Sequence, residues 1–178
     1  MSKYAHGSAI ELDLKAIGDD GFFVGYASVF GVKDRGGDIV QPGAFTASLK
    51  KYPPARVKML YQHDTSEPVG TWSSFTEDAR GLKAEGRFIL DTVKGREVYA
   101  LVKAGAIDGL SIGFRTIRDE MDRKSGARLL HELELWEVSI VTFPMNEDAT
   151  VTGVKSSPDK SFRALVEAIN AGRAHFKD

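Results

Sequence analysis

Runs of β-strand character follow one another through the middle of the chain, and this succession constrains the fold more than any other feature. Residues 22–31 are rich in aromatic and β-branched side chains and end on glycine. Residues 56–64 alternate between two faces, and His63 falls on the face of Met59 and Tyr61. Further strands are predicted over residues 71–78, 81–90, 110–122 and 127–144. Many short strands with few helices favour a β-rich barrel or an α+β fold over alternating βα units.

Three segments have helical character. Residues 44–52 suit one brief helix before two prolines, and residues 91–105 have helical apolar spacing, with Asp91 or Thr92 as cap. A third helix is amphipathic and follows a polar linker; its apolar positions are Phe162, Leu165, Val166 and Ile169. We therefore expect one main domain over residues 1–155 and a linker with a C-terminal amphipathic helix or tail over residues 156–178.

Charge and composition exclude several classes of protein. The chain has 178 residues with a formal net charge of -1, which gives no support for nucleic-acid or membrane-surface binding. It has no cysteine, so disulfides, thiolate nucleophiles and thiolate metal sites are excluded. Neither a secretory signal nor an apolar run of membrane-spanning length is visible, so a cytoplasmic protein is expected.

Residues 109–113 match the G-x-S-x-G pattern of a nucleophile elbow, with Ser111 at its centre. An elbow needs a strand before the serine and a helix after it, whereas here a predicted helix precedes Ser111 and an alternating, strand-like run follows. The pattern therefore gives no evidence for an α/β-hydrolase. From the residues alone, Ser111 is either a nucleophile or a small residue where a strand begins.

A nucleophilic serine needs a base and a group that orients the base. Of the four histidines, His63 and His131 lie on predicted strands, whereas the other two lie close to the ends of the chain. His63 is thus a candidate base or a half-buried residue at a strand end. Glu137 lies in the apolar run from Trp136 to Val141, where a carboxylate requires a histidine or arginine partner, either in a site or in a structural ion pair.

Metal and nucleotide chemistry have little support. Neither pair of adjacent histidine and acid, at residues 63–64 and 131–132, has the spacing of a helical H-E-x-x-H site. The chain contains neither a P-loop nor a dinucleotide fingerprint, and we expect no cofactor and no metal.

Five segments together resemble the tailed-phage prohead proteases, which are distantly related to the herpesvirus assemblin. They are "GYASVFG", "DRGGDIVQPGAF", "MLYQHD" with "PVG", "AGAIDGLSIGF" and "LWEVSIVTFPMN", and the resemblance covers roughly residues 22–155. It implies a serine endopeptidase built on an antiparallel β-barrel flanked by a few helices. Such an enzyme would act in the host bacterial cytoplasm, inside the procapsid, and would cut scaffold, the scaffolding segment of the major capsid protein, and often itself. A homo-oligomer or an assembly-dependent form is expected.

The resemblance assigns Ser111 as the nucleophile and His63 as the base. For the third member it points to Glu137, the acidic residue of "WEVSIV", whose burial also calls for a partner. Glu134, His131 and Asp64 remain as alternatives, in that order. Two other functions stay open: a catalytically inactive, scaffold-like capsid-binding β domain, and a serine esterase or amidase acting on small molecules. The presence of all three matching side chains favours the protease.

Overall fold

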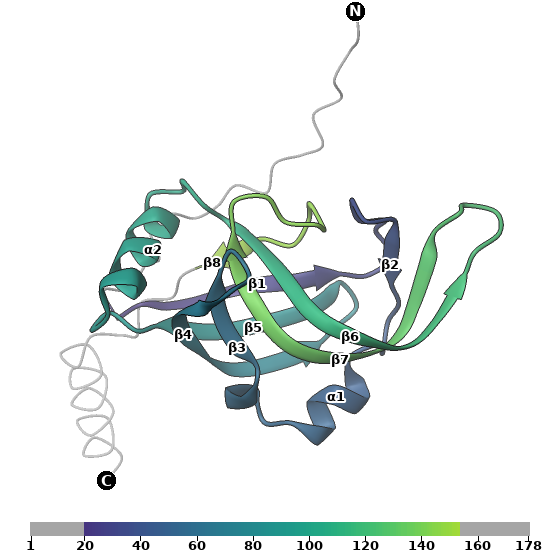
Figure 1. Ribbon diagram of the computed structural model, residues 1–178, viewed down its shortest axis with the longest axis horizontal. Helices are drawn as coiled ribbons and strands as arrows, with labels where there is room; N and C mark the ends of the chain where they lie inside the picture. The colour runs from purple at the N-terminus through teal and green to yellow at the C-terminus, as the bar shows by residue number, and fades with distance from the viewer. Residues whose placement is uncertain (1–19, 154–178) are drawn as a thin grey trace, which may run out of the picture.

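The computed structural model describes residues 20–153 (Figure 1). Its elements are β1 (Phe22–Val29), β2 (Asp38–Val40), α1 (Thr46–Lys51), the 3₁₀ turn η2 (Pro54–Arg56), β3 (Lys58–Tyr61), β4 (Asp64–Glu77), β5 (Gly81–Phe88), α2 (Val93–Lys103), β6 (Gly109–Met121), β7 (Arg128–Val141) and β8 (Val151–Gly153). The C-terminal amphipathic helix, the tail and the boundary of the main domain at residue 155 lie outside the described residues.

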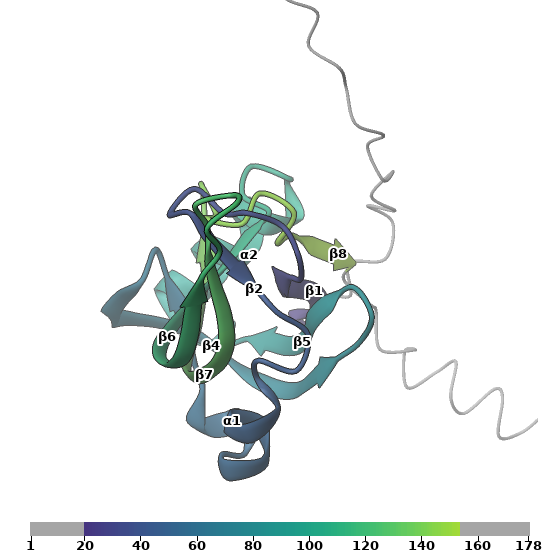
Figure 2. The same cartoon turned by 90° about the vertical axis from the view of Figure 1, so that its right-hand side faces the viewer.

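A single eight-stranded sheet curls around the core in the order β2-β7-β3-β4-β5-β1-β8, and β6 pairs with β7 off this path. Seen from one end, β6 and β7 lie on one side and β1 and β5 on the other (Figure 2). The mainly β expectation is confirmed, but the sheet is not purely antiparallel. Both β2 and β3 run parallel to β7, because α1 and η2 lie between them and carry the chain along that strand. The result is a curled half-barrel.

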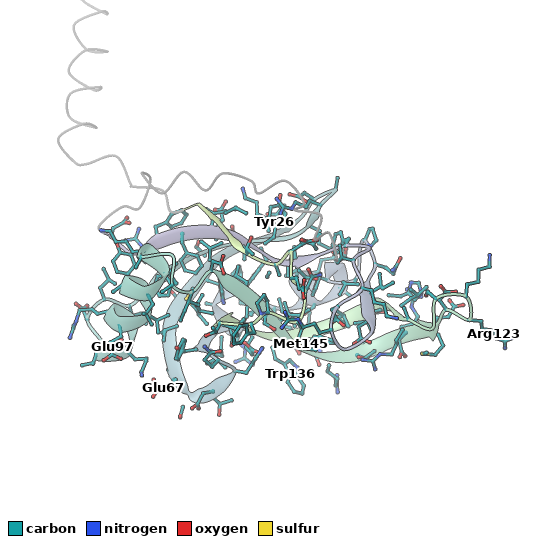
Figure 3. All side chains as sticks on the ribbon, turned by 90° about the horizontal axis from the view of Figure 1, so that it is seen from above. Tyr26, Glu67, Glu97, Arg123, Trp136 and Met145 are labelled. Carbon is teal, nitrogen blue, oxygen red and sulfur yellow. The ribbon has the colours of Figure 1, made fainter. Side chains whose placement is uncertain are left out.

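Strand β4 spans 14 residues and is longer than the strand predicted over residues 71–78, whereas β6 and β7, with 13 and 14 residues, agree with the strands predicted over residues 110–122 and 127–144. Residues 65–70, which lie outside the strands predicted from the sequence, belong to β4, since this part of the strand pairs with β3 and the rest of it pairs with β5. The far ends of β6 and β7 form a hairpin that projects from the sheet, with Arg123 near its tip (Figures 1 and 3).

Aromatic rings fill the concave side of the sheet. Phe23 stacks on Phe88 with ring centroids 4.7 Å apart and meets the edge of Trp72 at 5.4 Å. All three are at most 3% exposed, and burying each such side chain is worth about 1.5–3 kcal/mol. The core therefore holds β1, β4 and β5 together opposite the wall formed by β6 and β7.

The two α-helices form where the sequence predicted them. Thr92 is the cap of α2, because its side chain accepts a hydrogen bond from the Gly95 N–H at 3.0 Å. Short α1 packs against β7, where the Ser48 hydroxyl accepts the Leu135 N–H at 3.0 Å. Helix α1 thereby provides a hydrogen-bond acceptor for a backbone N–H of β7, between the part of this strand that pairs with β2 and the part that pairs with β3. Within residues 20–153, no helix has the length and apolarity that crossing a membrane requires.

Candidate active site

Strand pairing brings Ser111, Glu137 and the turn after β3 to one face of the sheet. Ser111 on β6 lies opposite Ser139 on β7, and Gly113 lies opposite Glu137. Paired residues in a sheet share a face, as do residues two apart on one strand. Ser111 and Glu137 are therefore diagonal neighbours on the face directed away from the core, next to β3.

Residue His63 projects from a tight two-residue turn and not from a strand as predicted. Tyr61 pairs with Asp64, and the two residues between them, Gln62 and His63, both have positive φ, at 54° and 60°. This is the type I′ hairpin pattern, which favours Asn-Gly. Holding larger residues in this region is unfavourable by about 1–2 kcal/mol each. Such strain is found mainly where function requires one particular side-chain direction.

The turn directs the imidazole onto Glu137. His63 Nδ1 lies 2.6 Å from Glu137 Oε1, and the two side chains are 43% and 14% exposed. This hydrogen bond raises the pKa of His63 above its ordinary value of 6.5, while partial burial opposes the rise. The partner expected for the carboxylate in this apolar strand is thus His63.

Glu137 reaches this position partly through a β-bulge. Gly113 pairs with Glu137 while Phe114 pairs with Leu135, so Trp136 is an extra residue in β7. Trp136 is 56% exposed and projects from the sheet into solvent (Figure 3), whereas the residues from Val138 to Val141 are buried. A bulge re-aims the side chains beside it, which places Glu137 beneath the turn.

The second glycine of the G-x-S-x-G pattern also has a structural reason. A Cβ at Gly113 would overlap Glu137 Oε1 and lie 2.8 Å from Glu137 Cδ. The glycine leaves room for the carboxylate, and an elbow turn plays no part. Ser111 lies inside a strand, as the order of helix, turn and strand predicted.

Sequence reasoning missed two polar residues that support the pair. The Ser139 hydroxyl donates to Glu137 Oε2 at 2.6 Å and accepts the His63 N–H at 3.2 Å. Gln62 donates from Nε2 to Thr142 Oγ1 at 2.7 Å and accepts the Thr142 N–H at 3.3 Å. The alternation of β7 could have indicated Ser139, because it shares the face of Glu137; nothing local indicated Gln62.

Ser111 itself is 5% exposed. Among the hydrogen bonds of residues 20–153, none joins its hydroxyl to His63. Beyond a bridge between Gly109 and Thr150 at its start, β6 has no neighbouring strand on its second edge among the described residues. The Leu110 N–H points away from β7 and donates to Ala149 O, so alternation directs the Ile112 N–H to the same side. That edge lies along a pocket of about 200 Å³ that Ser111 also lines.

The alternative third members lie in other surroundings. Glu134 is buried in a separate cluster, where it accepts hydrogen bonds from Tyr52 and Lys51 and pairs with Arg115 at 2.7 Å. These contacts, led by the bond from Tyr52, lower the pKa of Glu134 to about 2. His131 Nε2 is buried, has no hydrogen bond to any other described residue and lies 3.7 Å from Glu120 Oε2.

Asp64 is exposed and binds Ser66, and this contact lowers its pKa. Of the four candidates, only Glu137 forms a side-chain hydrogen bond with His63 in the described part of the chain. Within residues 20–153 no group of three or more histidine or acidic side chains is placed to hold a metal ion.

Comparison with known proteins places this chain in a family. The sequence model of the Caudovirus prohead serine protease family matches residues 10–162. The chain is 37% identical over 150 residues to the prohead protease of Enterobacteria phage HK97, covering 82% of this chain and 66% of that protein. It is 32% identical over 126 residues to the prohead protease of Escherichia phage T5, covering 70% and 59%. The chain thus spans just under two thirds of the length of the first relative and less of the second.

Two solved structures share the fold. The bacteriophage T4 capsid assembly protease superposes with a TM-score of 0.53 at 17% identity, over 69% of this chain and 82% of that one. The protease of KSHV, in complex with a hexapeptide phosphonate inhibitor, superposes with a TM-score of 0.52 at 14% identity, over 85% and 76%. Because the family match extends over most of the sequence, the chain belongs to the Caudovirus prohead serine protease family.

Proposed function

We propose that this chain is a serine endopeptidase of capsid maturation, with Ser111 as nucleophile, His63 as general base and Glu137 as the residue that orients the base. The observation that carries the proposal is the 2.6 Å contact between His63 Nδ1 and Glu137 Oε1, on the face that also holds Ser111. A carboxylate bound to Nδ1 leaves Nε2 as the nitrogen that exchanges protons with the serine.

The reaction proceeds in two halves. His63 Nε2 removes the proton of Ser111 Oγ as this oxygen attacks the peptide carbonyl, and Glu137 stabilises the imidazolium that forms. The imidazolium then protonates the leaving amine, and water activated by the same histidine releases the acyl group. The hydrogen bond between Ser111 and His63 forms as the substrate is engaged, since such contacts often tighten only in the substrate complex.

The substrate docks as an added strand on the free edge of β6. An extended peptide there would bind the backbone N–H and C=O groups of Ile112 and bring its scissile carbonyl to Ser111. The Ile112 N–H, which follows the nucleophile, is our candidate donor to the oxyanion. A donor of this kind is worth about 10²- to 10³-fold in rate.

The pocket beside this edge accepts an apolar side chain of the substrate. Most of its wall is apolar, formed by Ala27, Val32, Val40, Leu110, Ile112, Phe114 and Met145. The Ser28 hydroxyl in this wall is buried and has no hydrogen-bond partner among the described residues. Ala27→Leu would narrow the pocket and select against larger substrate side chains.

The protein substrates are scaffold or the scaffolding segment of the major capsid protein, and the chain also cuts itself. These assignments rest on the family and on relatives that are named for the prohead and for capsid maturation. The site of action is the procapsid inside the host bacterial cytoplasm, with activity that depends on assembly or on a homo-oligomer.

Co-expression with the capsid and scaffold proteins tests the proposal. We expect discrete new fragments by intact-mass spectrometry with the wild type and none with Ser111→Ala. Ser73→Ala is the matched control, because its exposed hydroxyl only binds the Glu85 carbonyl, and it should cleave normally. Unchanged masses with the wild type, together with co-assembly, would favour the inactive capsid-binding domain. Labelling of Ser111 by a fluorophosphonate without any protein cleavage would favour the esterase.

A further inference from the structure

The His63 turn holds a strained backbone and lacks the residues that would relax it. Gln62 and His63 both occupy left-handed conformations, at φ 54° and 60°, where asparagine and glycine are the usual residues. Left to itself, such a turn would sample other shapes, and the imidazole would leave Glu137. Contacts from elsewhere must therefore fix it.

Those contacts come from the end of β7. The Gln62 N–H donates to the Ile140 carbonyl at 3.0 Å, and the Gln62 side chain makes two hydrogen bonds to Thr142. The His63 N–H donates to the Ser139 hydroxyl at 3.2 Å. Four hydrogen bonds thus attach the two turn residues to residues 139–142.

Ser139 has a special place among them, because it touches both members of the His63–Glu137 pair. It is fully buried, accepts the backbone N–H of His63 and donates to Glu137 Oε2 at 2.6 Å. The other carboxylate oxygen, Oε1, is then free for His63 Nδ1. One hydroxyl therefore fixes the position of the turn and the rotation of the carboxylate together. Ser139 also lies opposite Ser111 on β6.

We propose that Ser139 is a positioning residue for the reaction of Ser111, and that the Gln62 side chain assists it from the outer side of the turn. The inference rests on the proposed function, since it assigns to both residues the task of holding His63 and Glu137 in reacting geometry. Misplacing a reacting group by about 1 Å lowers rates by about 10²-fold. Loss of the Ser139 hydroxyl should accordingly slow the reaction by about 10- to 100-fold.

Ser48 provides the matched control. Its hydroxyl is buried and also binds β7, through the Leu135 N–H, but it lies on α1 and does not touch His63 or Glu137. Ser48→Ala and Ser139→Ala each remove one buried hydroxyl that supports the same strand. If Ser139 were only structural, both variants would lose thermal stability and keep the same reactivity per folded molecule.

The test measures the rate constant for labelling of Ser111 by a fluorophosphonate as a function of pH, on the full chain, with thermal unfolding in parallel. We expect Ser139→Ala to react about 10- to 100-fold more slowly than Ser48→Ala, with the pH midpoint of labelling moved down toward 6.5. The Nδ1 proton resonance of His63 should shift or broaden as well. Gln62→Ala changes the exposed side of the turn and should slow labelling by a smaller factor. Gln62→Glu keeps an acceptor for the Thr142 N–H and should recover part of the lost labelling rate.

Equal rates and equal midpoints for Ser139→Ala and Ser48→Ala would overturn the inference while leaving the proposed function intact. If Ser139→Ala fails to fold, Gln62→Ala decides alone: a wild-type rate and midpoint would refute the positioning role of the turn contacts. Absence of labelling in the wild type itself would instead refute the proposed function, so the two failures are distinguishable.

Discussion

Replacing Gly113 with alanine perturbs the site without removing any of its functional groups. The glycine lies opposite Glu137 in the β6–β7 pair, and a Cβ there would lie 2.8 Å from Glu137 Cδ and 2.9 Å from Glu137 Cγ. Ordinary contact begins near 3.4 Å, so the carboxylate carbon must move by about 0.6 Å, and Oε1, which overlaps the new methyl, must move further. Oε1 is the atom that binds His63 Nδ1.

The expected loss of labelling rate follows from that displacement. A shift of about 1 Å in a catalytic contact typically lowers the rate by about 10²-fold, and loss of the orienting carboxylate from a serine triad by about 10⁴-fold. We therefore expect Gly113→Ala to label with a fluorophosphonate between 10²- and 10⁴-fold more slowly than the wild type. The variant should remain folded, because the exposed side of the site lets the Glu137 side chain move.

Gly86→Ala is the control for the effect of a methyl group on a strand glycine. A Cβ at Gly86, in β5, would lie 2.6 Å from Met59 Cε and 2.7 Å from Trp72, which are core atoms on the other face of the sheet. It should lower the melting temperature and leave labelling per folded molecule close to wild type. A folded Gly113→Ala protein that labels at the wild-type rate would refute the role of Glu137 as the orienting acid.

The remaining predictions concern charge and local structure. Labelling requires neutral His63, so the labelling rate should rise with pH through a midpoint above 6.5. Glu137→Gln should lower that midpoint and slow labelling by about 10⁴-fold. An unchanged midpoint would contradict the contact between His63 and Glu137. The hydrogen bond that raises the pKa of His63 also stabilises the fold below pH 6.5. This contribution is lost as pH rises through the folded-state pKa of His63. The difference in melting temperature between wild type and Glu137→Gln should therefore shrink over that range. Glu134→Gln should leave labelling unchanged but reduce stability above pH 4.5, with the difference vanishing as pH falls through about 2, as pH-dependent melting curves would show. Thr92→Ala removes the α2 cap and should destabilise the protein by about 1 kcal/mol in urea unfolding, with normal labelling of the folded fraction.

Local features of the sequence were sufficient for much of the fold. Helix α2 could be predicted because its apolar spacing and capping residues act within one helix, although the structure was needed to choose Thr92 over Asp91 as the cap. β1 and β5 were recognisable from composition and alternation alone. β2, in contrast, could not be predicted, because its three residues become a strand only by pairing with Arg128–Leu130, far along the chain.

The candidate site also has a part that the sequence could predict and a part that required the tertiary structure. The residues alone offered Ser111, His63 and Glu137 as candidates, the resemblance to the prohead proteases assigned their roles, and the apolar surroundings of Glu137 called for a partner. That His63 contacts Glu137, and not the alternative third members Glu134 or His131, depends on β3 lying parallel to β7 and on the turn at its end.

The sequence by itself determined which residue types could perform the chemistry and most of the elements that carry them, because side-chain chemistry, caps and alternation act over a few neighbouring residues. Only the tertiary structure decided which of these side chains meet. Ser139, Gln62 and Gly113 acquire their places through pairing between strands that are far apart in the chain, and through a strained turn that remote hydrogen bonds hold in place. Contacts between residues that lie far apart in the chain cannot be predicted from local patterns of the sequence.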